Sequence, residues 1–123
     1  MADRKTVLAI DDNVQMLGEF KNMLSANYDL RVAKSAVEAI SFLNREYTDI
    51  ILLDIEMPNI SGFEFLGDIK QIPSYEKVPV IIVSGNTSAE FLEKAKHSNA
   101  SDVLIKPVKL DELISIIEKN LKN

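Results

Sequence analysis

The stretch that decides the fold is Asp49-Ile50-Ile51-Leu52-Leu53-Asp54-Ile55-Glu56-Met57-Pro58. Its apolar run, residues 50–53, is too short for a buried helix and contains no Gly or Pro, so it predicts a strand covered on both faces. The run ends at Asp54, and Pro58 with Gly62 turns the following chain into a loop. Open α/β sheets place their ligands at the carboxyl ends of parallel strands, so we expect Asp54 to lie in a crevice.

Short apolar runs elsewhere in the chain predict four more strands. These runs are Val7–Ile10, Leu30–Ala33, Val78–Val83 and Val103–Ile105. After each of the five predicted strands, apolar residues recur at intervals of three and four, which is typical of a helix packed on one face. Strands that alternate with helices predict an α/β fold, here a (βα)5 doubly wound parallel five-stranded sheet with right-handed connections. We expect one domain over residues 1–123, because no linker or repeat interrupts the pattern.

Polar residues before each helical segment predict where the helices begin. Asn13 or Asp12 can cap the first helix. Three further starts have the capping-box pattern: Ser35–Glu38, Ser61–Glu64 and Thr87–Glu90. Pro73 is expected to stop the third helix, and Pro79 to lie near the start of the fourth strand. Asn99 is predicted to adopt the left-handed conformation that ends the fourth helix.

Composition excludes several classes of function. The chain has 123 residues, a net charge of −5 and no cysteine, so it offers neither a disulfide framework nor a thiolate metal site. Its single histidine, His97, excludes a multi-histidine zinc site and is expected to complement the dipole at the end of the fourth helix. The acidic balance argues against a nucleic-acid partner. No apolar run is long enough to span a membrane and Met1–Thr6 has no signal-peptide pattern, so we expect a cytoplasmic protein with no membrane partner.

Chemically reactive side chains gather at one edge of the predicted sheet. Asp11 and Asp12 follow the first strand, Asp54 the third, Ser84 the fourth and Lys106 the fifth. Parallel strands point their carboxyl ends to the same edge, so three carboxylates, a hydroxyl and an ammonium group should converge.

This set of groups favours phosphoryl chemistry. Three clustered carboxylates repel one another unless a cation joins them, and a hard divalent ion such as Mg²⁺ suits oxygen ligands. Lys106 supplies a second positive charge for a phosphoryl oxygen, and Ser84 a hydroxyl donor. Formation of an aspartyl phosphate on Asp54 needs these parts. Taken singly, each residue also has a plainer interpretation, as a helix cap, a turn former or a solvated loop residue; only their combination at one edge predicts the chemistry.

With these residues identified, the chain resembles a receiver domain of two-component response regulators over essentially its whole length. The resemblance rests on the acid pair, Asp54 with the residues after it, the hydroxyl and the lysine: Asp11-Asp12, Asp54-Ile55-Glu56-Met57-Pro58 with Gly62, Ser84 and Lys106-Pro107. It implies the flavodoxin-like receiver fold. It also implies that Asp54 accepts a phosphoryl group from a phosphohistidine on a histidine kinase or a histidine phosphotransfer protein.

The same resemblance implies a Mg²⁺ site and a switch. Asp12 and Asp54 would ligate Mg²⁺ directly, Asp11 would bind it through water, and the backbone carbonyl of Glu56 would complete the protein ligands. Lys106 would pair with Asp54 or with its phosphoryl group.

Ser84 would move to bond the phosphoryl group. In the family, this movement repacks the face formed by the fourth helix, fifth strand and fifth helix, which a downstream effector protein reads. The chain would then be a stand-alone receiver that catalyses only its own phosphotransfer and slow dephosphorylation, since no effector domain follows the fifth helix.

Two positions depart from the family pattern or vary within it. Many receivers carry an aromatic residue three positions before the lysine, where this chain has Val103, so an aromatic rotamer switch is absent. Glu56, two residues after Asp54, is hypothesised to affect the lifetime of the aspartyl phosphate, through repulsion or by engaging Lys106. In the alternative interpretation, Glu56 only solvates its loop.

Two other functions remain open from the sequence. A phosphorylation-independent adaptor that has kept the fold would bind its partner equally well without Asp54. A small phosphatase with an aspartyl nucleophile, similar to the haloacid-dehalogenase type, would carry a second Asp two residues after the nucleophile on the first strand, whereas Asp12 is followed by Asn13 and Val14.

Overall fold

The strands form one parallel sheet in the order β2-β1-β3-β4-β5. The computed structural model describes residues 4–58 and 60–122. The strands are β1 (Thr6–Ile10), β2 (Asp29–Ala33), β3 (Ile50–Asp54), β4 (Val80–Ser84) and β5 (Asp102–Ile105). The helices are α1 (Val14–Leu24), α2 (Ala36–Arg45), α3 (Gly62–Gln71), α4 (Ala89–Lys96) and α5 (Leu110–Leu121), with a short 3-10 helix, η1 (Pro73–Tyr75), after α3. The predicted (βα)5 sheet is confirmed; residues 1–3, 59 and 123 of the expected domain lie outside the described part of the chain.

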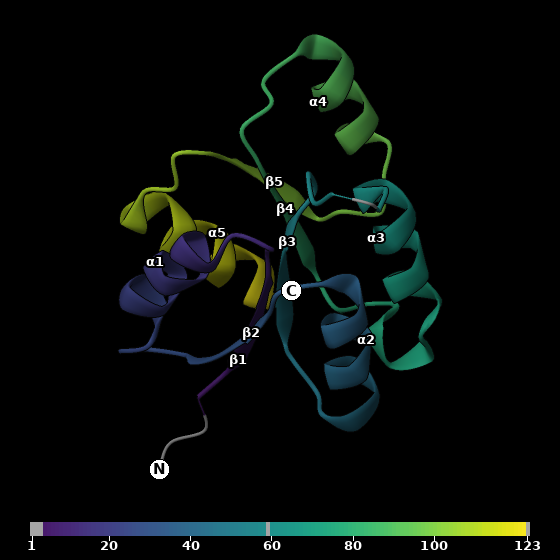
Figure 1. The fold of residues 1–123 in the computed structure, drawn as a ribbon. Coiled ribbons are helices and arrows are strands. Elements are labelled where there is room, and N and C mark those ends of the chain that lie inside the picture. The colour runs from purple at the N-terminus through teal and green to yellow at the C-terminus, as the bar shows by residue number, and fades with distance from the viewer. Residues whose placement is uncertain (1–3, 59, 123) are drawn as a thin grey trace.

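Helices cover both faces of the sheet (Figure 1). Helices α1 and α5 pack on one face, and α2, α3 and α4 contribute to the core on the other. Successive residues of β1 divide between the two cores: Val7 and Ala9 face α1 and α5, whereas Leu8 and Ile10 face the opposite side. Every residue of β3 is buried, as predicted for a strand covered on both faces.

The helix starts follow the predicted caps at three of the four places where a cap is predicted. The side chains of Asn13, Ser35 and Ser61 accept hydrogen bonds from backbone N–H groups in the first turns of α1, α2 and α3. Glu38 bonds back to the N–H of Lys34, one residue before the cap itself. Helix α3 ends at Gln71, before Pro73, as predicted.

The predicted boundaries around α4 and β4 need correction. Ser88, and not Thr87, caps α4, because its hydroxyl accepts the N–H of Phe91 at 3.1 Å. The C-cap of α4 is His97, so Asn99 lies beyond the position that a left-handed capping residue would occupy.

Strand β4 begins at Val80, two residues later than predicted. Pro79 lies just before the strand and contributes its carbonyl, which accepts the N–H of Ile51 at 3.0 Å. A proline there costs the ladder no donor.

Among the helices of the described residues, none is long and apolar enough to cross a membrane.

Candidate functional site

The residues singled out in the sequence lie at the carboxyl edge of the sheet. Asp54 is the last residue of β3 and Ser84 is the last residue of β4. Asp11 directly follows β1, and Lys106 directly follows β5. Because β1, β3, β4 and β5 are consecutive neighbours in the sheet, these strand ends stand side by side.

Three carboxylates meet at the ends of β1 and β3. Asp11, Asp12 and Asp54 each place one oxygen within 4.8 Å of the others. Asp11 is 1% and Asp54 5% exposed, whereas Asp12 is open to solvent. Buried carboxylates at this separation repel one another, so the cluster favours a cation. The predicted convergence of the acids is confirmed.

A single atom of Asp11 shows that the cluster fits a cation. Its Oδ1 accepts the N–H of Asn13 at 2.9 Å. Its Oδ2 is buried and has no hydrogen-bond partner among the residues that the structure describes. A buried carboxylate oxygen without a donor is costly unless a positive charge stands beside it. Three carboxylates, one with a buried oxygen that accepts no hydrogen bond from the described residues, offer the oxygen ligands that suit a hard divalent ion such as Mg²⁺.

Lys106 supplies the positive charge of the site itself. Its Nζ lies 3.6 Å from Asp11 Oδ2 and 3.8 Å from Asp54 Oδ1. Its side chain is 28% exposed, so the ammonium group bridges the two buried acids from the solvent side. The predicted pairing of Lys106 with Asp54 is therefore present in the structure.

The Asp54 carboxyl is held in a balance of opposing effects. Its pKa is raised from the ordinary value of 3.8 to about 6; burial is the largest cause, and the nearby Asp11 carboxylate acts in the same direction. The hydrogen bond from the Glu56 N–H, at 3.1 Å, and the charge of Lys106 lower that pKa. Since burial dominates, Asp54 holds a proton more strongly than a solvated aspartate.

Ser84 is placed one residue beyond the strand partner of Asp54. In the sheet register Asp54 pairs with Val83, and the Ser84 side chain is fully buried at the same edge. Its hydroxyl accepts the N–H of Asn86 at 3.0 Å, and its carbonyl accepts the N–H of Lys106 at 2.8 Å. Ser84 therefore ties together the loops that follow β4 and β5.

Glu56 has a contact that sequence reasoning missed. Its Oε1 accepts the backbone N–H of Gly85 at 3.3 Å, whereas the ion pairs of Lys106 are with Asp11 and Asp54. The predicted engagement of Lys106 by Glu56 is not what the structure has. No sequence pattern signals a side chain bonding across two loops, although Glu56 itself, two residues after Asp54, had been singled out in the sequence.

Gly62 has a steric role in the β3–α3 loop that the sequence did not reveal. A methyl group at this position would collide with the backbone carbonyl oxygen of Ile55 and lie 2.6 Å from its Cδ1. Only a residue without a side chain allows helix α3 to start this close to the end of β3.

Val103, in place of an aromatic residue, is partly buried against the core that α2, α3 and α4 share.

Comparison with known proteins identifies the family to which this chain is similar. The chain matches the response regulator receiver domain over residues 7–118. The two-component response regulator ORR12 of Oryza sativa subsp. japonica is 30% identical, over 90% of this chain and 93% of that protein. A probable cyclic di-GMP phosphodiesterase of Vibrio cholerae is 32% identical over 96% of this chain, which spans only 27% of that protein.

A solved structure shows the same fold. The chemotaxis protein CheY4 of Vibrio cholerae superimposes with a TM-score of 0.88 at 26% identity, and the match covers 95% of this chain and 98% of that one. Receiver domains are phosphoacceptor switches that bind Mg²⁺ at an acidic pocket and interact with histidine kinases and downstream effectors. The chain belongs to the response regulator receiver domain family, the phosphoacceptor domains of two-component signalling.

Proposed function

We propose that Asp54 is the phosphoacceptor and receives its phosphoryl group from a phosphohistidine on a histidine kinase or a histidine phosphotransfer protein. The observation that carries this proposal is the pairing of a buried carboxylate with a lysine: Lys106 Nζ lies 3.8 Å from Asp54 Oδ1 at the end of the central strand. Rigid placement of a nucleophile beside a fixed positive charge is what phosphoryl transfer asks of a protein.

The residues of the chain divide the chemistry between them. An oxygen of Asp54 attacks the phosphorus, an O–P bond forms, the P–N bond of the donor breaks, and its electron pair returns to the imidazole nitrogen. A pKa of about 6 leaves Asp54 mainly ionised at neutral pH, so the attacking form is available. The ammonium group of Lys106 stabilises the negative charge on the transferring oxygens.

Mg²⁺ is the cofactor that the acidic cluster would hold. Asp12 and Asp54 would bind it directly, Asp11 through water, and Glu56 through its backbone carbonyl. The buried Oδ2 of Asp11, which accepts no hydrogen bond among the described residues, supports this set. When bound, Mg²⁺ supplies positive charge that favours transfer between two negatively charged groups.

The phosphorylated state would act as a switch for a downstream effector protein. The phosphoryl group adds negative charge and acceptor oxygens beside Lys106 and Ser84. The Ser84 hydroxyl, which now accepts from Asn86, would turn to donate to the phosphoryl group and pull its loop with it. The protein would catalyse only its own phosphotransfer and dephosphorylation.

Two further statements stay predictions: that residues 1–123 form one receiver domain, and that the protein is cytoplasmic.

The test is intact-mass measurement after incubation with Mg²⁺ and acetyl phosphate. We expect the wild-type chain to gain one phosphoryl group, roughly 80 Da, and Asp54→Ala to gain none. Asp68→Ala, which removes an exposed carboxylate from α3, is the matched control and should gain it. If the wild-type chain gains no mass and fails to bind beryllofluoride, a phosphoryl mimic, the adaptor function replaces this one. Turnover of external phosphate esters would instead support the phosphatase.

A further inference from the structure

The loop between β4 and α4 is tied together by its own side chains. The Ser84 hydroxyl accepts the N–H of Asn86 at 3.0 Å, and Asn86 Oδ1 accepts the N–H of Ser88 at 2.9 Å. The Ser88 hydroxyl then accepts the N–H of Phe91 at 3.1 Å in the first turn of α4. Each side chain bonds a backbone group two or three residues ahead, so movement at the end of β4 is passed to the start of α4.

Glu56 attaches this loop to the phosphoacceptor. Its backbone N–H donates to Asp54 Oδ1 at 3.1 Å, and its carboxylate Oε1 accepts the N–H of Gly85 at 3.3 Å. Gly85 lies inside the tied loop, between Ser84 and Asn86. One residue thus contacts Asp54 with its backbone and the loop before α4 with its side chain.

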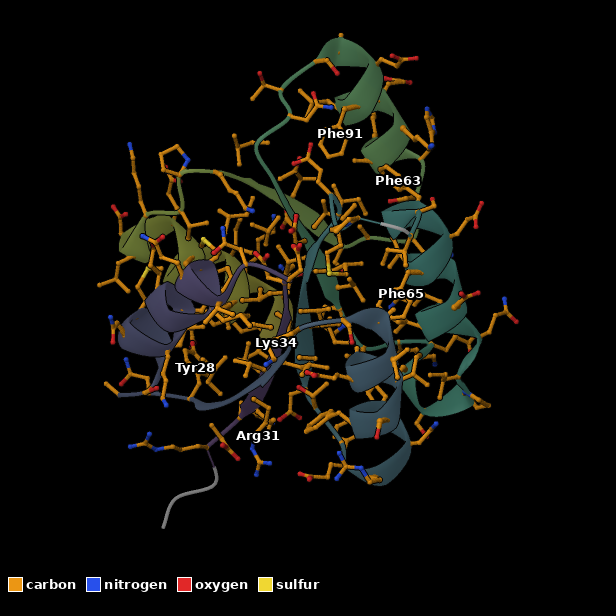
Figure 2. The ribbon with its side chains drawn as sticks, viewed as in Figure 1. Tyr28, Arg31, Lys34, Phe63, Phe65 and Phe91 are labelled. Carbon is orange, nitrogen blue, oxygen red and sulfur yellow. The ribbon has the colours of Figure 1, made fainter. Side chains whose placement is uncertain are left out.

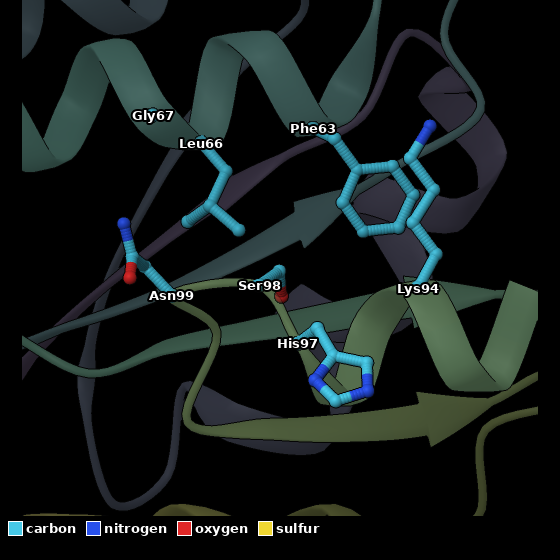
Figure 3. Close-up of a pocket in the computed structure, with 7 residues that line it drawn as sticks. All are labelled: Phe63, Leu66, Gly67, Lys94, His97, Ser98 and Asn99. Carbon is cyan, nitrogen blue, oxygen red and sulfur yellow. The ribbon is translucent and has the colours of Figure 1, made fainter.

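Helix α4 is held lightly enough to respond. Two of its residues, Phe91 and Ala95, are buried. The ring of Phe91 lies 6.0 Å from that of Phe63 on α3, and Lys94 Nζ lies 4.8 Å from the centre of the Phe63 ring. Beside these contacts, α3 and the end of α4 enclose an open pocket of about 320 Å³ (Figure 3). Figure 1 shows α4 projecting past the end of the sheet, with the β4–α4 loop leading into it.

We propose that Glu56 is a positioning residue that bridges Asp54 to the β4–α4 loop and holds the loop in the position that it has in the unphosphorylated protein. A phosphoryl group on Asp54 then releases the loop from Glu56. This inference rests on the proposed function, because it assumes that Asp54 is the phosphoacceptor. The added negative charge lies on Asp54, two residues before Glu56 in the chain, and repels the Glu56 carboxylate. The hydrogen bond from the Gly85 N–H to this carboxylate is therefore weakened. With Val103 in place of an aromatic switch residue, this bridge gives Asp54 a route to α4.

The first test uses the metal-free, unphosphorylated protein. We expect the Gly85 amide to exchange with solvent about fivefold faster in Glu56→Ala than in the wild-type chain, the effect of losing one hydrogen bond of ordinary strength. Its NMR resonance should also shift. Glu56→Gln keeps an acceptor oxygen and should restore part of the protection, which a general loss of structure would not do.

Glu64→Ala serves as the charge-matched control. Glu64 lies in the first turn of α3, is exposed, and should leave the Gly85 amide unchanged. If Glu56→Ala also leaves that amide unchanged, the bridge does not exist and the inference is overturned. This result does not depend on phosphorylation, so it is separate from any failure of the proposed function.

The second test adds Mg²⁺ and beryllofluoride. In the wild-type chain the Gly85 amide should lose the contribution of Glu56, so the resonances of wild type and Glu56→Ala should converge. A wild-type chain that binds beryllofluoride and keeps the Glu56-dependent difference would contradict the release step. Absence of beryllofluoride binding would count against the proposed function, while the metal-free comparison still decides whether the bridge exists.

Discussion

The hydroxyl of Tyr28 donates a hydrogen bond to the carboxylate of Glu118, which joins the loop after α1 to helix α5 on the same face of the sheet. Tyr28 is 5% exposed, and Figure 2 labels it beside α1. Burial, followed by the bond to Glu118, raises the pKa of the Tyr28 hydroxyl well above its usual range. The folded protein therefore binds this proton more tightly than the unfolded chain does.

Replacement of Tyr28 by Phe should change how stability depends on pH. Because the folded pKa is raised, the contribution of Tyr28 is fully present below pH 10, the unfolded pKa, and is lost as the pH rises above it. We expect Tyr28→Phe to lower the free energy of unfolding by about 1–2 kcal/mol near neutral pH and the two proteins to converge in alkali. Urea unfolding across this range measures the effect. If the free energies of unfolding of the two proteins differ by the same amount at every pH, the prediction is contradicted. Tyr47→Phe, at an exposed tyrosine, is the control.

Two glycines of α3 should respond to alanine in opposite directions. Gly62→Ala places a methyl group 2.6 Å from Ile55 Cδ1, so it should lower the free energy of unfolding by about 2 kcal/mol. Gly67→Ala meets no heavy atom within 4 Å in mid-helix and should raise that free energy by up to about 1 kcal/mol. Urea midpoints of both variants test this. A stabilising Gly62→Ala would show that the start of α3 can move away from Ile55.

The cap of α4 can be tested with adjacent residues of similar chemistry. Ser88→Ala removes the hydroxyl that accepts the N–H of Phe91 and should lower the free energy of unfolding by about 1 kcal/mol. Thr87→Ala, one residue earlier, should change stability by less than about 0.5 kcal/mol. Thermal or urea unfolding of the two variants compares them directly. A larger loss of stability in Thr87→Ala than in Ser88→Ala would favour the cap at Thr87 that the sequence predicted.

Removal of the Asp54 charge should stabilise the protein when no metal is present. Asp11 and Asp54 are both buried carboxylates that share one lysine, Lys106. In the presence of a chelator, Asp54→Asn should raise the free energy of unfolding by about 1–2 kcal/mol, because one buried charge is gone. Addition of Mg²⁺ should then stabilise wild type more than the variant. Equal stabilisation of both by Mg²⁺ would mean that Asp54 is not a ligand. The exposed Asp68→Asn is the control.

The alternation of elements could be predicted from sequence because four of the five strands carry two separate signals. An apolar run such as residues 50–53 gives the strand, and an acid, serine or lysine marks its carboxyl end. Parallel topology then brings these ends together without knowledge of the strand order. The convergence of Asp11, Asp12 and Asp54 followed from this logic alone.

What the sequence could not provide are features set by loop geometry. Thr87 and Ser88 both suit a helix cap, and only the backbone path after Asn86 decides between them. The bond from Gly85 to Glu56 joins two loops, so its partners are 29 residues apart and follow no local pattern. Likewise the need for glycine at position 62 arises from the approach of α3 to Ile55, a tertiary contact.

The place of each strand in the sheet also sets how long each half of the site persists. Asp54 ends β3, the middle strand, which is bonded on both sides, whereas Lys106 follows β5 at the edge of the described sheet. Interior strands generally open at free energies closer to that of global unfolding, whereas an edge strand can open at a lower free energy. Asp54 therefore stands on a strand that opens less readily than the strand that positions Lys106.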